Sequence, residues 1–431
     1  LNVQNEANTI TALEPEIVGS HFIGQSGTSY DSAPTAKTVT SLGTIRGLAA
    51  EEPTKQGSYY SASVAYFGKR TDLRSDLPGQ QNTDLFAVAL ASPLPRFAVK
   101  MPSGQVITLV PFAKSVGGSG ISSAKDQFQP TNQIVDFYIT QLANSGPADA
   151  NPSINGGRYD AQFTINYEDV EQGADHDMDV IAEYTLEAQP DNTLKVTVRT
   201  TYQAGGIQQN VGYIISGTTR DGVYLVAQDE EAQDEDIAIP YFLNVPPGKN
   251  PGYCDQANPP DACKKLPCAT GSCSNKSASV QIFSPGTSSA TLLKDPLWYA
   301  AKWGGFVDRN NNSRPDLQIE WDNNGDGIPD TYFLVQNPLR LKETLKRALE
   351  TVVERTASAG NVTSNSTSFA SDSLVFQSIF NTVNWSGDLI AYPITASGIS
   401  PTLSWKASDH VPIPATRKLF TRSGGSAVPF L

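Results

Sequence analysis

Alternating apolar and polar positions dominate the middle of the chain. Between residues 134 and 227, apolar side chains repeatedly occupy every second position, as at Phe163, Ile165 and Tyr167. A period of two is the pattern of a strand with one buried face, and tight turns separate the runs. Six short strands of this kind predict a β-sandwich, and we assign residues 131–250 to it.

Helical spacing of apolar residues occurs in three places. Residues 57–70 carry aromatic side chains on one face, and Asp295-Pro296 is typical of a helix start, with Asp as N-cap and Pro at the first helical position. Gly304-Gly305 is expected to end this second helix. The third helix, at residues 337–356, has the clearest apolar stripe: Leu341, Leu345, Ala348, Leu349, Val352 and Val353.

Weaker patterns surround these elements. Residues 1–56 are rich in Ser, Thr, Gly and Ala and are expected to be loop-rich, and residues 57–130 are expected to form an α/β segment. A Ser/Thr/Asn linker follows at residues 357–371, and residues 372–431 contain further short strands. The expected fold class is therefore mainly β with short helices, a β-rich α+β protein.

Composition limits the partners. The 431 residues are 39% hydrophobic and 17% charged, and the formal net charge of −13 argues against binding to nucleic acid or to an anionic membrane surface. No apolar run is long enough to span a membrane. The chain begins at Leu1 without a signal sequence, so we expect a mature or trimmed fragment.

Four cysteines lie in one Pro-rich loop, residues 251–276. They are Cys254, Cys263, Cys268 and Cys273. Their spacing lacks the paired C-x-x-C of common zinc sites, so two disulfides are favoured over a zinc ion. Three pairings are possible, and the sequence does not choose among them. Disulfides indicate an oxidising compartment outside the cytoplasm.

Two consecutive loops, within residues 295–336, place Asp or Asn at relative positions 1, 3, 5 and 9. The side chains are Asp308, Asn310, Asn312 and Asp316 in the first loop and Asp322, Asn324, Asp326 and Asp330 in the second. This spacing is similar to that of an EF-hand loop, which encloses Ca²⁺ in oxygen ligands. The backbone carbonyls of Arg314 and Ile328, at position 7, would add one ligand to each loop.

The two loops match this pattern to different degrees. Gly327 occupies position 6 of the second loop, where an EF-hand makes its sharp turn, whereas the first loop has Ser313 there. Neither loop has Glu at position 12, so position 9 would have to bind the ion directly. We expect Ca²⁺ as the cofactor, with one or two ions bound. The alternative is a pair of Asx-rich turns without an ion.

An acidic stretch at residues 168–179 interrupts the predicted sandwich. Asp175, Asp177 and Asp179 would share one side of an extended chain, where like charges repel unless water or a cation separates them. A solvated turn is the favoured interpretation. A metal site or a buried polar network is the alternative.

Catalytic signatures are missing from the sequence. It has three histidines and contains none of the patterns G-x-S-x-G, H-E-x-x-H or C-x-x-C. Carboxylates are numerous, but their spacing along the chain does not show that any two flank a cleft. We therefore expect no enzymatic activity.

Several short stretches of the sequence, taken together, form a pattern that resembles a known family. They are residues 71–74 (TDLR), 112–118 (FAKSVGG), 166–179 (NYEDVEQGADHDMD), 215–219 (ISGTT), 297–306 (LWYAAKWGGF), 385–389 (WSGDL) and the two Asp loops. In this order they resemble the PilC/PilY family of type IV pilus-tip adhesins and pilus-biogenesis proteins, over roughly residues 57–431. Family members typically carry a variable N-terminal region, often a von Willebrand A domain, and a C-terminal β-propeller.

The resemblance implies a calcium-binding adhesin and assembly factor at the tip of a type IV pilus, with a role in twitching motility. Its partners would be minor pilins and a host or abiotic surface. Its location would be extracellular, at the pilus tip or the outer surface of a Gram-negative bacterium. Two alternatives stay open: a calcium-stapled structural surface module without a ligand of its own, and a secreted hydrolase.

The chain also departs from that family. The D-x-S-x-S metal site of von Willebrand A domains is missing, so residues 57–130 would be a remnant of such a domain. Residues 372–431 would supply only the first strands of a propeller, which needs at least four blades. The tripeptide Arg-Gly-Asp is absent, since Arg220-Asp-Gly222 has a different order. The four cysteines look like an insertion.

Overall fold

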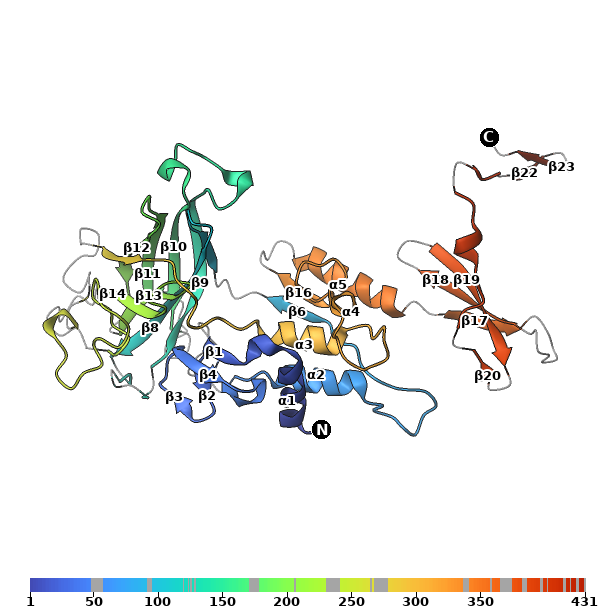
Figure 1. Cartoon of the computed structure of the whole chain (residues 1–431), viewed down its shortest axis with the longest axis horizontal. Coiled ribbons are helices and arrows are strands. Elements are labelled where there is room, and N and C mark those ends of the chain that lie inside the picture. Colours follow the sequence, from blue (N-terminus) through green and yellow to red (C-terminus); the bar gives the residue numbers. More distant parts are fainter. Residues whose placement is uncertain are drawn as a thin grey trace. The chain divides into compact units, whose positions relative to one another are not determined.

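A computed structural model (Figure 1) contains two compact units, Leu1–Pro338 and Leu339–Leu431, and each is described by itself. The description covers all residues except 48–56, 91–94, 119, 123, 125, 128, 170–177, 205–206, 230–240, 264–265, 267–277, 336–340, 357–358, 365–373, 382–385, 396–397, 401, 414–415, 419, 424–425 and 430–431.

The largest element of the first unit is a nine-stranded antiparallel sheet (Figure 1) in the order β14-β13-β8-β9-β10-β11-β12-β15, with β7 beside β8. The strands are β7 (Phe97–Lys100), β8 (Val106–Gly117), β9 (Thr131–Ala143), β10 (Asp160–Glu168), β11 (Val180–Ala188), β12 (Leu194–Gln203), β13 (Gln208–Ser216), β14 (Gly222–Gln228) and β15 (Ser279–Phe283). The sheet is nearly closed around one apolar core. Because β7 and β8 belong to it, the sheet starts before residue 131, where the sequence analysis began the sandwich.

Aromatic side chains stack through this core. The ring of Phe163 stacks on those of Phe97 and Tyr184, with centroid distances of 4.1 and 5.0 Å. The Tyr184 hydroxyl donates to the carbonyl of Gly212 at 2.8 Å and lies 2.7 Å from the hydroxyl of Tyr167. Alternate residues of β11 are buried along its whole length. The period-two pattern therefore identified the inward-facing residues correctly in this part of the sheet.

Strand β8 is buried on both faces from Leu109 to its end, which suits the apolar residues at 109–113. Leu109 and Ala113 belong to the sandwich core. Val110 and Phe112 belong to another core, which also contains Phe22 from the N-terminal part of the chain. The outer face of β8 therefore joins the sandwich to the N-terminal residues.

The rest of the first unit combines helices with short strands. The elements are α1 (Val3–Leu13), α2 (Tyr60–Arg70), α3 (Pro296–Gly305), α4 (Gln318–Trp321), β1 (Gly19–Phe22), β2 (Gln25–Ser26), β3 (Ser29–Tyr30), β4 (Ala36–Val39), β5 (Ile45–Arg46), β6 (Ala87–Leu90), β16 (Tyr332–Val335) and the 3₁₀ helices Pro15–Ile17, Leu42–Thr44, Pro147–Asp149, Asn155–Gly157 and Asp261–Cys263. Strand β6 pairs in parallel with β16, whereas β1–β4, β2–β3 and β2–β5 are antiparallel. Helices α1, α2 and α3 share one core, in which Tyr66 and Trp303 meet edge to face at 4.8 Å.

Helices α2 and α3 confirm two of the predicted helices, and Asp295 caps α3 by accepting a hydrogen bond from the N–H of Leu297 at 2.7 Å. Gly304 and Gly305 are the last two residues of α3, as expected. A Cβ atom on Gly304 would lie 2.6 Å from the Cβ atom of Ala65 on α2. These glycines therefore allow α2 and α3 to pack closely.

Helix α1 lies in residues 1–56, where the sequence analysis expected loops. The side chain of Asn2 accepts a hydrogen bond from the N–H of Asn5 at 3.1 Å and so caps the helix. Ala7 and Ile10 are buried on its inner face. The many Asn and Thr residues, which have modest helix propensity, concealed this short apolar stripe.

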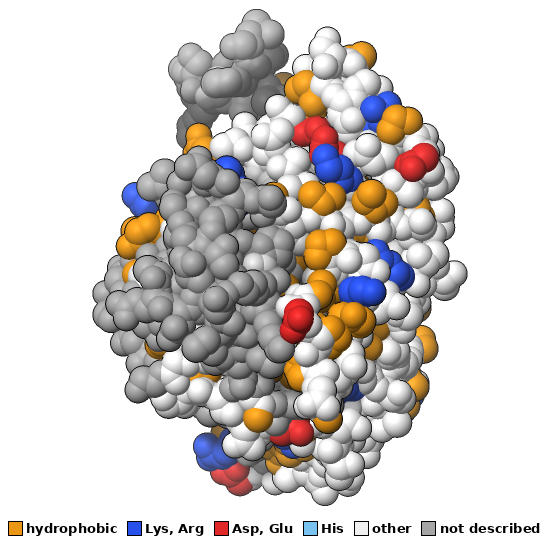
Figure 2. All heavy atoms as spheres, turned by 90° about the vertical axis from the view of Figure 1, so that its left-hand side faces the viewer, with side chains coloured by type: hydrophobic (Ala, Val, Ile, Leu, Met, Phe, Trp, Pro, Cys, Tyr) orange, Lys and Arg blue, Asp and Glu red, His pale blue; other side chains and the backbone are white. Residues whose placement is uncertain are grey.

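The face of the first unit at the left of Figure 1 carries hydrophobic side chains interspersed with charged ones (Figure 2). Cross-strand ion pairs contribute to the polar surface of the sheet. Glu187 on β11 pairs with Lys195 on β12 at 2.9 Å, and Glu183 pairs with Arg199. An antiparallel sheet with one face in solvent has this mixed outer surface.

The second unit contains one long helix and a further sheet. Its elements are α5 (Leu341–Thr356), β17 (Ala359–Ser364), β18 (Leu374–Asn381), β19 (Ser386–Thr395), β20 (Gly398–Ile399), β21 (Trp405–Lys406), the 3₁₀ helix Ala407–His410, β22 (Phe420–Ser423) and β23 (Ser426–Pro429). Helix α5 confirms the predicted third helix. Strand β17 lies within residues 357–371, which were predicted to be a linker, and it pairs with β18. The linker prediction is therefore wrong for residues 359–364. The mainly β fold with few helices is confirmed, and the propeller stays a prediction.

Among the described residues, no helix has both the length and the apolar character that crossing a membrane requires.

Candidate metal centre

The two Asp loops share left-handed backbone turns at the same positions. Asn311 and Ser313, at positions 4 and 6 of the first loop, both have φ of 60°. Gly325 and Gly327, at the same positions of the second loop, have φ of 78° and 79°. This left-handed conformation favours glycine, so the second loop adopts it without steric cost, whereas the first must place Asn and Ser there.

The carboxylate at position 1 lies at the centre of each loop. Asp308 accepts hydrogen bonds from the backbone N–H groups of Asn312 and Ser313, at 3.2 and 2.7 Å. Asp322 accepts from the corresponding N–H groups of Asp326 and Gly327, at 3.1 and 2.8 Å. These matched hydrogen bonds hold both loops in the same curl.

Positions 3 and 5 repeat the correspondence. In the first loop, Oδ1 of Asn310 accepts from the N–H of Asn312, and Oδ1 of Asn312 accepts from the N–H of Arg314. In the second loop, Asn324 and Asp326 accept from the N–H groups two residues further on, at 3.0 and 2.8 Å. Each of these side chains is therefore turned back into its own loop.

Position 9 differs between the loops. In the first, the carboxylate of Asp316 accepts from the side-chain amides of Asn310 and Asn312, at 3.0 and 2.9 Å, so positions 3, 5 and 9 meet. In the second, Asp330 accepts from the backbone N–H of Asn323 at 3.2 Å. Across the part of the chain that the structure describes, no three His, Cys, Asp or Glu side chains form a group that could hold a metal ion.

The donor atoms of both loops are carboxylate, amide and carbonyl oxygens, the hard ligands that Ca²⁺ prefers. In the first loop two of the four side chains are neutral amides, whose oxygens accept from N–H groups of the loop while their NH2 groups donate to Asp316. The chemistry of the donor set fits Ca²⁺, and the second loop offers the larger negative charge.

Hydrogen bonds keep two of these carboxylates ionised. The amides of Asn312 and Asn310 lower the pKa of Asp316 below its ordinary value. Burial on its own raises the pKa of Asp322, but hydrogen bonds from Gln318 and from loop N–H groups outweigh burial and lower it. A deprotonated carboxylate is the form that binds a metal.

Aromatic side chains tie each loop to a helix. The hydroxyl of Tyr66 on α2 donates to the carbonyl of Ser313 at 3.1 Å, and the indole N–H of Trp298 on α3 donates to the carbonyl of Gly327 at 3.3 Å. Both carbonyls belong to position 6. The position of each loop is therefore fixed relative to the helical core.

Glu320 links the first loop to α4. Its side chain accepts hydrogen bonds from the backbone N–H groups of Arg309 and Leu317, at 2.9 and 3.1 Å, and its carbonyl accepts from Val307 at 2.8 Å. Sequence reasoning missed this residue. The available signal was a lone Glu beside Trp321, between the two loops.

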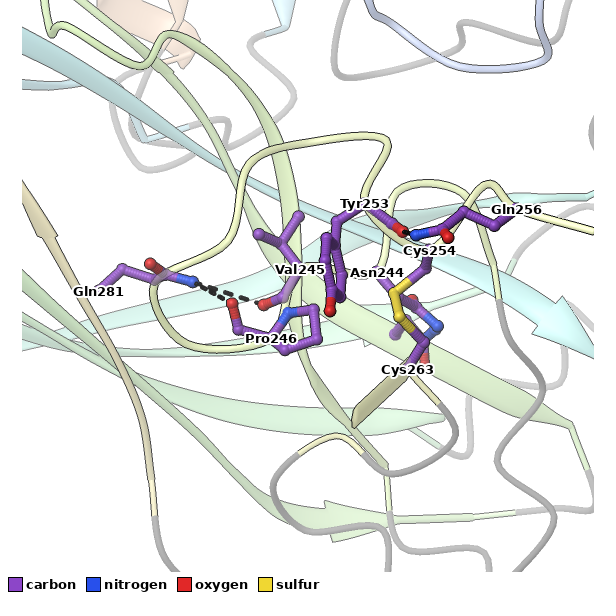
Figure 3. Close-up of a disulfide and its surroundings, with 9 residues drawn as sticks. Asn244, Val245, Pro246, Tyr253, Cys254, Gln256, Cys263 and Gln281 are labelled. Atoms are coloured by element: carbon purple, nitrogen blue, oxygen red, sulfur yellow. Dashed lines mark hydrogen bonds between the residues drawn. A yellow bond between two sulfur atoms is a disulfide. The ribbon is translucent and has the colours of Figure 1, made fainter. Parts of the chain in front are cut away.

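One predicted disulfide lies in the Pro-rich loop (Figure 3). Cys254 and Cys263 are joined, with their Cα atoms 5.5 Å apart, and both are buried. Nearby, the side-chain amide of Gln281 on β15 donates to the carbonyls of Val245 and Pro246 (Figure 3). Cys268 and Cys273 lie outside the described residues.

The acidic stretch is only partly described, because Asp175 and Asp177 lie outside the described residues. Asp179 is buried, with an exposed fraction of 6%, and its carboxylate accepts from the backbone N–H of Asp169. Glu168 is also buried and accepts from the N–H of Met178 at 3.2 Å. The solvated turn is therefore the wrong interpretation for Asp179, which belongs to a buried polar network at the end of the sandwich.

Comparison with known proteins agrees with this architecture. Residues 99–267 match the family model described as the β-sandwich of PilY1 homologs, and residues 1–68 match the one described as their second domain. The first match starts within β7. The first match covers the β-sandwich, and the second covers the N-terminal residues that contain α1 and most of α2. The chain is therefore a β-sandwich protein with an additional N-terminal domain.

Two relatives from Xylella fastidiosa (strain Temecula1) narrow the assignment, and both are named "Type IV pilus biogenesis factor PilY1 homolog". One is 42% identical over 429 residues, which cover 96% of this chain and 27% of that protein. The other is 25% identical over 143 residues, or 30% of this chain and 12% of that protein. No solved structure matches. The chain belongs to the PilY1 family, and it spans about a quarter of the first relative's length.

Proposed function

We propose that this chain is the part of a type IV pilus biogenesis factor that joins a β-sandwich to a calcium-stabilised helical domain. The observation that carries the proposal is the 42% identity, over 96% of this chain, to a protein named as such a factor. Because the chain spans 27% of that relative, the role in biogenesis belongs to the whole protein. The proposal includes no enzymatic activity.

A deletion strain tests this role. Loss of the gene should reduce surface pili and twitching motility, and the full-length protein supplied in trans should restore both. Electron micrographs count the pili, and a gold-labelled antibody against the sandwich locates the protein. Normal piliation in the deletion strain would overturn the proposal.

The loops support calcium as the stabilising ligand. The residues that would hold it are Asp308, Asn310, Asn312, Arg314 and Asp316 in the first loop and Asp322, Asn324, Asp326, Ile328 and Asp330 in the second. A bound Ca²⁺ would neutralise carboxylates that otherwise repel one another. The chain's own contribution is to hold the loops in place through Tyr66, Trp298 and Glu320. Millimolar calcium outside the cell would favour this role.

Adhesion is the finer part of the proposal. We place the protein outside the cell, at the pilus tip or the outer surface, with minor pilins and a host or abiotic surface as partners. The disulfide between Cys254 and Cys263 supports an oxidising location. Gold label along the shaft or inside the cell, with none at pilus tips, would contradict the location.

A further inference from the structure

A cavity of about 430 Å³ opens beside the first calcium loop. Its walls come from the end of α1, from α3, from the loop itself and from α4. The volume lies in the range of about 300–1,000 Å³ that small-molecule sites occupy. We propose that this cavity binds an acidic saccharide, with the sugar ring on Trp321 and the carboxylate on Arg314.

Trp321 forms a fixed aromatic wall. Its indole is half-buried, the ammonium of Lys302 lies 4.2 Å from its ring centroid, and Trp298 meets it edge to face at 5.6 Å. These two contacts fix the orientation of the ring at the cavity wall, with Lys302 itself lining the inner end. The apolar face of a sugar ring is suited to packing against such an indole.

The inner end of the cavity is already charge-compensated. Lys302 pairs with Glu14 at 2.6 Å, and the indole N–H of Trp303 donates to the same Glu14 oxygen at 2.8 Å. Lys302, Trp303 and Glu14 are all buried. The positive charge of Lys302 therefore serves Glu14 and the indole of Trp321, and it is not the group that selects an anion.

Arg314 supplies the anion-binding group at the rim. Its side chain is exposed beside the hydroxyl of Tyr66, and its guanidinium makes no ion pair with any described residue. A guanidinium fork binds a carboxylate through two parallel hydrogen bonds. Lysine in the same place would offer only a point charge.

The remaining lining favours hydroxyl groups. Asp316 and Gln318 are exposed and line the cavity with oxygen acceptors. Asp316 accepts from Asn310 and Asn312, and because a carboxylate offers roughly four acceptor sites, it would share the remaining ones between the proposed Ca²⁺ and a sugar hydroxyl. A wholly apolar ligand would cover these polar groups without pairing them, which costs free energy. A saccharide with a carboxylate satisfies both the apolar and the polar walls.

An acidic saccharide would be the ligand class of the proposed adhesive function. Only the biological purpose of the cavity rests on that proposed function, since binding of the saccharide can be measured without it. Binding is measured by titration calorimetry on the purified chain, with a glucuronic acid disaccharide and with the same disaccharide converted to its neutral amide. The acid should bind, and the amide should bind at least about tenfold more weakly because the charge-assisted hydrogen bonds are lost.

Matched variants test the residues. Arg314→Ala should weaken binding by about tenfold or more, and Arg309→Ala, which removes an exposed arginine of the same loop outside the cavity, should leave it unchanged. Trp321→Ala also alters the core, so Trp321→Phe is compared with it. Phe should retain most of the binding, and circular dichroism checks the fold.

Equal binding of acid and amide, equal effects of the two arginine variants, or no binding of either disaccharide would overturn the inference. Normal piliation in a strain carrying Arg314→Ala, together with loss of saccharide binding in the purified variant, supports the cavity as a site separate from assembly. If the gene deletion leaves piliation normal while the purified chain still binds the acid, the proposed function fails and the cavity stands.

Discussion

The close packing of α2 against α3 can be tested directly by the substitution Gly304→Ala, which should change the free energy of unfolding. In Gly304→Ala, the new Cβ atom would lie 2.6 Å from the Cβ atom of Ala65 and 2.9 Å from that of Leu85. Ordinary carbon contacts lie near 3.5–4.0 Å, so the two helices must separate by roughly 1 Å. Overpacking of a core costs about 1–3 kcal/mol. The better helix propensity of alanine returns about 1 kcal/mol.

The net expectation for Gly304→Ala is a loss of about 0–2 kcal/mol in the free energy of unfolding. Urea unfolding followed by tryptophan fluorescence measures it, because Trp298, Trp303 and Trp321 all lie in or against this core. Ala65→Gly is the matched partner, since it removes the nearest atom and costs about 1 kcal/mol of helix propensity on its own.

A double-mutant cycle separates packing from propensity. If the contact with Ala65 is the cause, the double variant should be more stable than the sum of the single variants by about 1 kcal/mol or more. Strict additivity, or a stabilising effect of Gly304→Ala alone, would refute the packing explanation for this glycine.

The other predictions concern calcium, protonation and the cysteines. Chelation should lower the free energy of unfolding by about 1.4 kcal/mol when free calcium had been ten times the dissociation constant. Asp326→Ala should remove most of that difference, Asn323→Ala at position 2 of the same loop should preserve it, and identical melting curves with and without chelator would exclude a calcium role. Burial raises the pKa of Glu14 to about 7, although Lys302 opposes the shift. The stability that Glu14 contributes is therefore complete below its ordinary pKa of 4.5 and is lost as the pH rises through about 7. Relative to Glu14→Gln, the original protein should lose stability between pH 5 and pH 8, and parallel urea profiles would contradict this. Non-reducing mass spectrometry should find the Cys254–Cys263 pair and no free thiol at Cys268 or Cys273, whereas alkylated thiols would contradict it. Replacing Cys254 and Cys263 with Ser should cost about 2–3 kcal/mol, because the closed loop is short.

Periodicity predicted the elements whose burial follows one simple rule. The strands β10 and β11 alternate, and α5 has an apolar stripe, so both were found from the sequence. Helix α1 was missed because only a few of its residues are buried. The position of Gly304 at the end of α3 was predicted, but its packing role was not, because that role depends on Ala65, a residue far away in the sequence.

At the candidate site too, local spacing could be predicted from the sequence, and contacts with distant residues could not. Their spacing gave the residues that turn inward, including those of the first loop despite Ser313 at position 6. The partners that fix the loops, Tyr66, Trp298 and Glu320, have no local signal, since each contact is set by the tertiary fold. The burial of Asp179 was missed for the same reason.

Strand β6 is synthesised long before its partner β16, which lies near the end of the first unit. Tyr66 and Ser313, which this arrangement brings together, are 247 residues apart. At a synthesis rate of about 5–20 residues per second, the first helices stay without their partners for roughly 10–50 s. The sandwich strands, made in the interval, can pair before β16 is available to β6. A chain cut short between β15 and α3 would therefore hold a complete sandwich, with Phe22 packed on it, while α1 and α2 lack the α3 side of their core. These two helices are the part that proteases or chaperones would meet first.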